Sequence, residues 1–165
     1  MFDRRTVVAG VVGVAVAPMG ERAALAQAAP STYGSISVDV APLRASGLGG
    51  YADQVRAALE AELRQAFADR LARGGARLVV RVDAISLRAY AGSGSSRFGG
   101  SGMQSDYLEG EALVLGRRGE VLLRHPQLSA VPSSSGGAWY LPDSEGRRLV
   151  ALAGHFAGWL RRALG

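Results

Sequence analysis

Three acidic residues about two thirds of the way along the chain are the first candidates for chemistry. Asp106, Glu109 and Glu111 lie in a segment whose apolar and polar residues alternate as in a strand. Glu109 and Glu111 would share one face of that strand, where two carboxylates could act as an acid–base pair or hold a cation. Together with Arg97 they define one hypothesis, a small enzyme built on carboxylate and arginine groups. The alternative is a solvated strand face on which acids meet arginines.

The other residue types that could do chemistry are few. The two histidines, His125 and His155, belong to no spaced metal-binding pattern, and we interpret each as a packing or surface residue. The chain has no cysteine, which excludes a disulfide, a thiolate metal site and a cysteine nucleophile. The glycines of 92–105 lack the Gly-Lys-Ser/Thr ending of a phosphate-binding loop. The sequence therefore predicts a non-enzymatic protein with no catalytic residues, no metal and no cofactor.

Apolar side chains in two glycine- and serine-rich loops are candidates for contact with a partner. Phe98 and Met103 lie inside the first loop, and Trp139 and Tyr140 follow the second. Large apolar side chains on such loops are typical of protein or lipid contacts. The alternative is that Trp139 and Tyr140 fold back as a lid on the core.

The N-terminal 26 residues have the three parts of a cleavable export signal. A charged start carries Arg4 and Arg5, an apolar stretch follows over 7–17, and Ala24-Leu25-Ala26 provides the small residues that a signal peptidase requires. We expect cleavage after Ala26. The apolar stretch is too short to span a bilayer, which takes about 20 helical residues, so no stable membrane span is expected after removal of the signal.

Three details favour the twin-arginine export route. Arg4-Arg5 is followed by Thr6 and two valines, which resembles the twin-arginine motif. The apolar stretch is rich in glycine and alanine and is therefore only mildly hydrophobic, and Arg22 places a positive charge near the cleavage site. The alternative is an ordinary secretory signal that happens to begin with two arginines. Either route predicts a periplasmic or secreted protein.

The chain is basic, with 19 arginines, no lysine and 14 acidic residues. The use of arginine alone is typical of codon bias in a GC-rich genome. The arginines are spread among acids instead of being clustered, and an exported protein rarely meets DNA, so we expect no nucleic-acid partner. A mild attraction to anionic membrane surfaces is the more natural use of the excess charge.

Hydrophobic periodicity predicts six elements after the signal. The helix expected over 51–73 repeats apolar residues at every fourth position, namely Val55, Leu59, Leu63, Phe67 and Leu71. The last helix is expected to bury Leu149, Leu152, Ala153, Phe156, Leu160 and Leu164, with Arg161 and Arg162 in its last turn. Four strands are expected, over 35–40, 78–90, 107–115 and 120–131.

Glycines, prolines and changes of parity predict where these elements end or bend. Gly74-Gly75 is expected to cap the first helix, and residues 116–119 to form a hairpin turn. A parity change predicts a β-bulge near Ala84, and Pro126 predicts that the last strand is interrupted or lies at an edge. We further expect mobile loops at 92–105 and 132–137, and Asp143 or Ser144 as the cap of the last helix.

The element order β-α-β-β-β-α predicts an α+β fold. We expect a two-layer sandwich in which a four-stranded mixed sheet carries both helices on one face. The first two strands should be parallel and the last three an antiparallel meander. The chain would divide into a signal peptide at 1–26, a linker at 27–34 and a single domain at 35–165.

This order of elements behind an export signal resembles that of small envelope-assembly modules of Gram-negative bacteria, such as the lipopolysaccharide-assembly lipoprotein LptE. The resemblance covers about 35–164 and rests on element order alone. Those proteins carry a lipid-bearing cysteine, which this chain lacks. The resemblance implies an accessory or binding protein of the cell envelope, with an envelope protein or lipid as its partner. It implies no functional residues and no oligomeric state.

Overall fold

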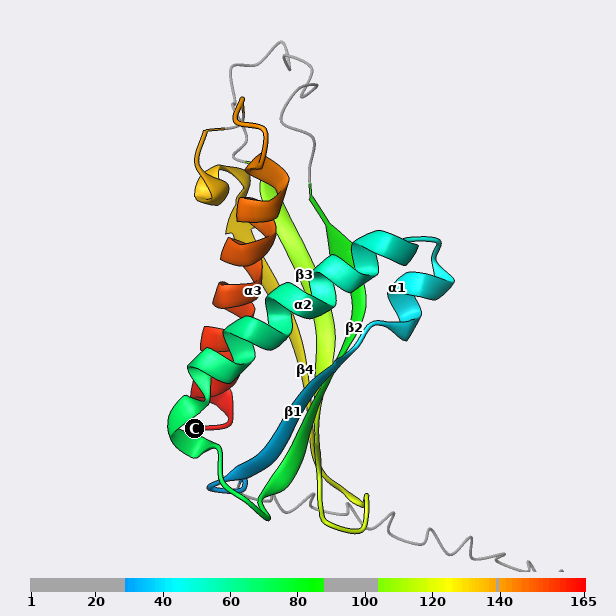
Figure 1. Ribbon diagram of the computed structural model, residues 1–165, viewed down its shortest axis with the longest axis vertical. Coiled ribbons are helices and arrows are strands. Elements are labelled where there is room, and N and C mark those ends of the chain that lie inside the picture. The colour runs from blue at the N-terminus through cyan, green and yellow to red at the C-terminus, as the bar shows by residue number, and fades with distance from the viewer. Residues whose placement is uncertain (1–28, 88–103, 139) are drawn as a thin grey trace, which may run out of the picture.

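The protein folds into one sheet with its two long helices on the same side (Figure 1), as the sequence predicts. The computed structural model describes residues 29–87, 104–138 and 140–165. The elements are β1 (Tyr33–Asp39), α1 (Ala41–Ala45), α2 (Gly49–Ala66), β2 (Ala76–Ser86), β3 (Ser105–Leu115), β4 (Val121–Pro132) and α3 (Ser144–Ala163). Two short 3₁₀ helices, η1 (Ala68–Arg70) and η2 (Ser133–Gly136), complete the described chain.

The sheet has the predicted topology, with strands in the order β1-β2-β3-β4. β1 is parallel to β2, while β2, β3 and β4 form an antiparallel meander. The register of β2 shifts between Val82 and Ala84, which confirms the predicted bulge. β4 lies at an edge and continues past Pro126 without a break, so the edge alternative is the correct one.

The core lies between the sheet and the two long helices. α2 crosses the β1–β2 half obliquely, and α3 packs along the β4 side (Figure 1). The predicted stripes are almost all buried: α2 contributes Ala52, Val55, Leu59 and Leu63, and α3 with its cap contributes Leu149, Leu152, Ala153, Phe156, Leu160 and Leu164. Burial of these faces supplies most of the favourable free energy of folding.

The first long helix, α2, ends earlier in the sequence than predicted. α2 stops at Ala66, and the chain turns at Phe67, whose buried ring packs edge-on against Tyr33 with centroids 5.4 Å apart. Leu71, the last residue of the predicted stripe, is therefore exposed. Gly74 adopts a φ of +79°, but it does so in the turn that leads into β2 and not as the cap of the helix. The predicted glycine cap was wrong because the contact of Phe67 with Tyr33 ends the helix earlier.

Four other details differ from the sequence-based expectations. β1 begins at Tyr33, two residues earlier than expected, because the Tyr33 side chain is fully buried. The segment predicted as a loop before α2 contains α1, and α2 already begins at Gly49. Residues 133–136, predicted as part of a mobile loop, form η2. Asp143 holds the N-cap position of α3 but makes no side-chain cap bond, because its carboxylate pairs with Arg147.

None of the helices described is both long and apolar enough to cross a membrane. The loop expected at 92–105 lies almost wholly outside the described residues, and so does the predicted signal peptide at 1–26.

Candidate functional site at the edge strand

A groove lies between the edge strand β4 and the C-terminal half of α3. It has a volume of about 660 Å³, which falls in the range of small-molecule and peptide sites. We call it the β4-edge groove, and its lining residues are His125, Gln127, Leu128, His155, Trp159, Arg162 and Ala163. The two histidines, which we interpreted separately as packing or surface residues, thus line one groove.

Three side chains of α3, namely His155, Trp159 and Arg162, form one wall of the groove. The indole Nε1–H of Trp159 donates to Nε2 of His155 at 2.9 Å, one helical turn away. Nε2 must then be the unprotonated nitrogen of the ring. The guanidinium of Arg162 lies 4.1 Å from the centre of the Trp159 ring, a cation–π contact. These contacts hold the indole in place although it is 52% exposed.

The β4 wall is tied to α3 through Gln127. Its Nε2 donates to the backbone carbonyl of Phe156 at 2.8 Å, which joins the edge strand to the helix. Gln127 Oε1 and His155 Nδ1 are both shielded from solvent and make no hydrogen bond with the described residues. Unsatisfied buried polar atoms of this kind cost about 1–3 kcal/mol each, and a polar group of a bound partner could satisfy these two.

A second, smaller hollow lies on the opposite side of β4, on the face of the sheet that carries no helix. Its volume is about 260 Å³, and its lining residues are Ala84, Ile85, Ser86, Tyr107, Glu109 and Leu128. Leu128 therefore borders both hollows and is 65% exposed. Exposed Trp159, Leu128 and Tyr107 thus form an apolar path around the sheet edge. We call the groove and the hollow together the β4-edge surface.

The open face of the sheet is charged at its centre. Glu111 lies 3.5 Å from Arg81 and 3.2 Å from Arg124, so one carboxylate joins guanidinium groups from two neighbouring strands. A hydrogen bond from Arg81 to Asp83, and the charges of Asp83, Glu111 and Asp39, raise the pKa of the Arg81 guanidinium. The centre of this face is consequently charged and not apolar.

The carboxylates of the enzyme hypothesis are not brought together. Glu109 and Glu111 do share the open face, as predicted, but Glu109 borders the smaller hollow while Glu111 is engaged by arginines. Arg97 lies outside the described residues. Asp106, which we had grouped with them, points to the opposite side and is completely buried. Among the described residues no group of three or more metal-ligating side chains is close enough to hold a metal ion.

Asp106 forms a buried ion pair with Arg148, near the start of α3. Its Oδ2 accepts from Arg148 Nε at 2.8 Å, and its Oδ1 accepts from a second guanidinium nitrogen and, at 2.9 Å, from Ser133 Oγ in η2. The hydrogen bond to Asp106 raises the pKa of Arg148. Gly136 is needed beside the pair, since a Cβ there would lie 2.4 Å from Arg148 Cγ. The pair therefore fastens β3, η2 and α3 together.

The phenol of Tyr51 in α2 has a raised pKa, which an unfolding measurement can detect. Burial, helped by the charges of Glu145 and Asp106, raises its pKa to about 12. Because the folded state keeps the phenol neutral while the unfolded chain ionises near pH 10, the free energy of unfolding should fall as the pH rises from about 10 to 12. Urea unfolding at about pH 9 and about pH 11.5 should show this fall, and Tyr51→Phe should reduce it. An equal fall in the variant would contradict this assignment.

Of the four loop residues proposed for partner contact, only Tyr140 is among the described residues. Phe98, Met103 and Trp139 lie outside the described residues. Tyr140 is strongly exposed, so its own side chain does not fold back onto the core as a lid.

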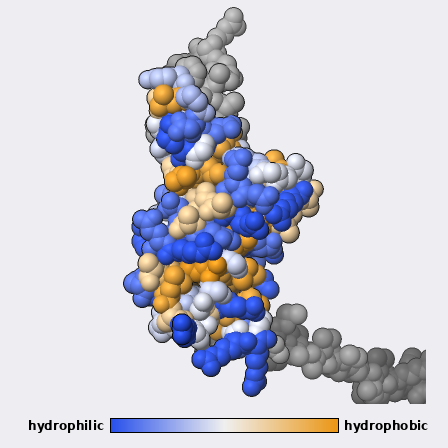
Figure 2. Space-filling model, viewed as in Figure 1, coloured by the Kyte–Doolittle hydropathy of each residue, from blue (hydrophilic) through white to orange (hydrophobic). Residues whose placement is uncertain are grey.

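Sequence reasoning missed the β4-edge surface because each half of it resembles ordinary surface. The only local signal was Trp159, a large aromatic residue placed among polar positions of α3 and close to two arginines. In the view of Figure 2, hydrophobic surface lies between hydrophilic areas and does not form one large patch. The site became visible only when the fold placed β4 beside α3.

Comparisons with known proteins do not assign a family. No family model and no curated protein matches the chain. Among solved structures, the chain is similar to a crystal structure of a protein from Caulobacter crescentus that is described provisionally as a lipoprotein. The two share 17% sequence identity with a TM-score of 0.46, over 78% of this chain and 86% of the other.

Proposed function

We propose that this chain is an accessory protein of the cell envelope that acts by binding a partner protein at the β4-edge surface, without catalysis. The observation that carries the proposal is the apolar path from Trp159 over Leu128 to Tyr107. It wraps around a sheet edge and borders two hollows. Exposed apolar side chains gathered at hollows are typical of interaction sites.

The residues of the surface have the composition of a protein interface. Trp, Tyr and Arg are the residue types that contribute most to binding energy in such interfaces, and all three are present. The surface continues from one side of β4 to the other, so a partner protein could cover more of it than a small molecule could. Pro126 lacks a backbone N–H at the middle of β4, which disfavours addition of a long strand. Docking through side chains is the mode that remains.

The charge of the groove indicates which partner would fit. Arg162 lies over Trp159 and has no carboxylate within ion-pair distance among the described residues, whereas its neighbour Arg161 pairs with Asp69. A partner segment that carries apolar side chains and a carboxylate would therefore complement the groove. The apolar groups would contact Leu128 and Trp159, and the carboxylate would meet the Arg162 guanidinium.

We infer export through the Arg4-Arg5 signal, cleavage after Ala26, and a periplasmic or secreted domain in a Gram-negative bacterium. An envelope protein is then the natural class of partner.

Site-specific photo-crosslinking in the native host tests the proposal. A benzophenone amino acid is placed at Leu128 or at Trp159, which border the groove, or at Val150 as the control. Val150 lies on the same helix as Trp159 and is similarly exposed, at 48% against 52%. We expect Leu128 and Trp159 to give the same crosslinked protein, and Val150 to give none.

Two results would count against the proposal. Crosslinks of the same yield from all three positions would mean that contacts are unspecific. Crosslinks from Val150 alone would move the interface to the other end of α3.

A further inference from the structure

The β3–β4 hairpin and the turn before β2 lie together at one end of the sheet (Figure 1), and four arginines belong to or adjoin these two segments. Arg117 and Arg118 lie in the hairpin turn, Arg73 lies in the turn before β2, and Arg77 lies at the start of β2. The hairpin is held against that turn, since Arg117 Nε donates to the carbonyl of Gly74 at 3.2 Å. We call these four residues the arginine end; all four are exposed.

The arginine end gathers four exposed arginines that have no acidic partner among the described residues. No carboxylate lies within ion-pair distance of its four guanidinium groups among the described residues. The acid nearest in sequence, Glu120, instead accepts a hydrogen bond from the backbone N–H of Arg118 at 3.0 Å. By contrast, on α2 the guanidinium of Arg56 lies 3.6 Å from a carboxylate oxygen, and that of Arg64 lies 2.9 Å from one. The arginine end therefore presents concentrated positive charge.

Two large apolar side chains are exposed beside this charge. Leu71 is 43% exposed just before Arg73, and Val121 is 45% exposed immediately after the hairpin. The lowest part of the described molecule in Figure 2, where the hairpin lies, is strongly hydrophilic. Arginine binds phosphate groups through paired N–H donors, and apolar side chains beside a basic cluster can enter the headgroup region. A protruding end with both features fits a surface better than it fits a small molecule.

We propose that the arginine end docks the protein onto an anionic phospholipid membrane. The guanidinium groups would bind lipid phosphates, while Leu71 and Val121 contact the headgroup layer. This surface shares no residue with the β4-edge surface, so membrane docking and partner binding can be tested separately.

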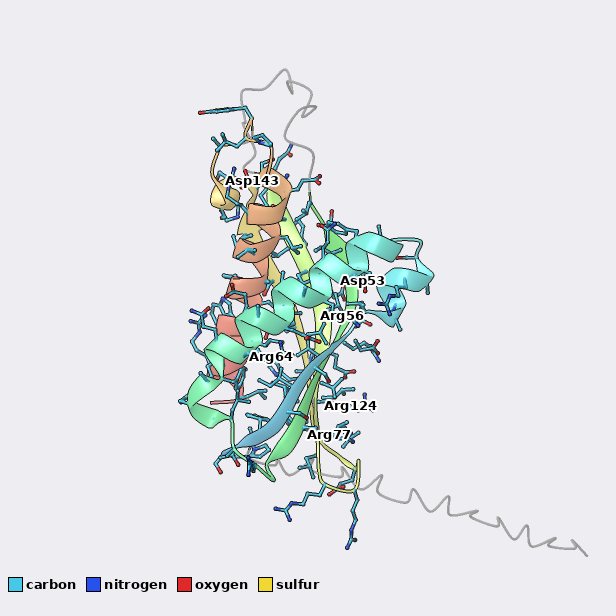
Figure 3. The ribbon with its side chains drawn as sticks, viewed as in Figure 1. Asp53, Arg56, Arg64, Arg77, Arg124 and Asp143 are labelled. Atoms are coloured by element: carbon cyan, nitrogen blue, oxygen red, sulfur yellow. The ribbon has the colours of Figure 1, made fainter. Side chains whose placement is uncertain are left out.

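Vesicle binding tests the proposal with two variants of equal charge. Arg77→Gln/Arg118→Gln removes two arginines of the arginine end that make no side-chain hydrogen bond or ion pair among the described residues. Arg56→Gln/Arg64→Gln removes two arginines from α2, away from this end (Figure 3). Each protein, as purified from its host, is sedimented with vesicles of phosphatidylcholine alone or with about a third phosphatidylglycerol.

We expect binding to the anionic vesicles only, falling as salt is added. The variant at the arginine end should bind roughly 30-fold more weakly, from the typical contribution of an arginine near an anionic surface. The α2 variant should change binding less than about threefold, since those arginines are already paired with acids. Equal losses in both variants would show that net charge alone acts and would overturn the proposal. If the protein bound vesicles of phosphatidylcholine alone as tightly as the anionic vesicles, the proposal would be overturned as well.

Discussion

Asp106→Asn is expected to lower the free energy of unfolding by about 3–5 kcal/mol. The carboxylate is completely buried and accepts hydrogen bonds from Arg148 and Ser133. Asn has nearly the same shape but no charge, so the variant would leave the buried guanidinium without its counter-charge. Urea unfolding followed by circular dichroism measures the change.

The matched control is Asp53→Asn on α2. Asp53 also pairs with arginines, Arg44 and Arg56, but its side chain is half exposed. Exposed ion pairs contribute at most about 1 kcal/mol, so this variant should be nearly as stable as the parent chain. Similar losses of unfolding free energy in the two variants would show that burial does not determine how much the Asp106 ion pair stabilises the protein. Replacing Asp106 and Arg148 together by apolar residues should recover part of the loss, because no buried charge then remains.

Replacing Arg4 and Arg5 by lysine is expected to abolish appearance of the processed protein in the periplasm. Lysine keeps the positive charge but loses the planar, forked donors of the guanidinium, so a receptor that reads paired arginines would no longer bind the signal. Fractionation and immunoblotting of the full chain in its host distinguish the precursor from the form cleaved after Ala26.

Arg22→Lys is the control for this experiment, because it makes the same chemical change outside the motif. We expect normal processing of that variant. Normal processing of the double variant would instead favour the ordinary secretory route, which the sequence left open as the alternative.

Much of the fold could be predicted because its signals are local. The stripe of α3, the hairpin at 116–119 and the bulge before Ala84 each follow from residues only a few positions apart. The end of α2 could not be predicted in this way. It depends on the contact between Phe67 and Tyr33, which come from opposite ends of a long stretch of chain.

The surroundings of individual side chains also depend on contacts that are distant in sequence. Asp106 resembled its neighbours Glu109 and Glu111 in sequence, and only its pairing with Arg148, 42 residues away, shows that it is buried. His125 and His155 come from β4 and α3 and resembled surface or packing residues until the fold placed them on one groove. The proposed binding surface therefore depends on contacts between segments whose own patterns are ordinary.

The affinity of the crosslinked partner for two variants tests most directly whether the partner binds at the β4-edge surface. Trp159→Ala removes the largest side chain of the groove, and Val150→Ala removes a similarly exposed side chain of the same helix. Calorimetry should show binding at least about 30-fold weaker for Trp159→Ala, as for a typical interface hot spot. Val150→Ala should change it less than about threefold. Affinities that agree within about threefold for both variants and the parent chain would contradict the claim.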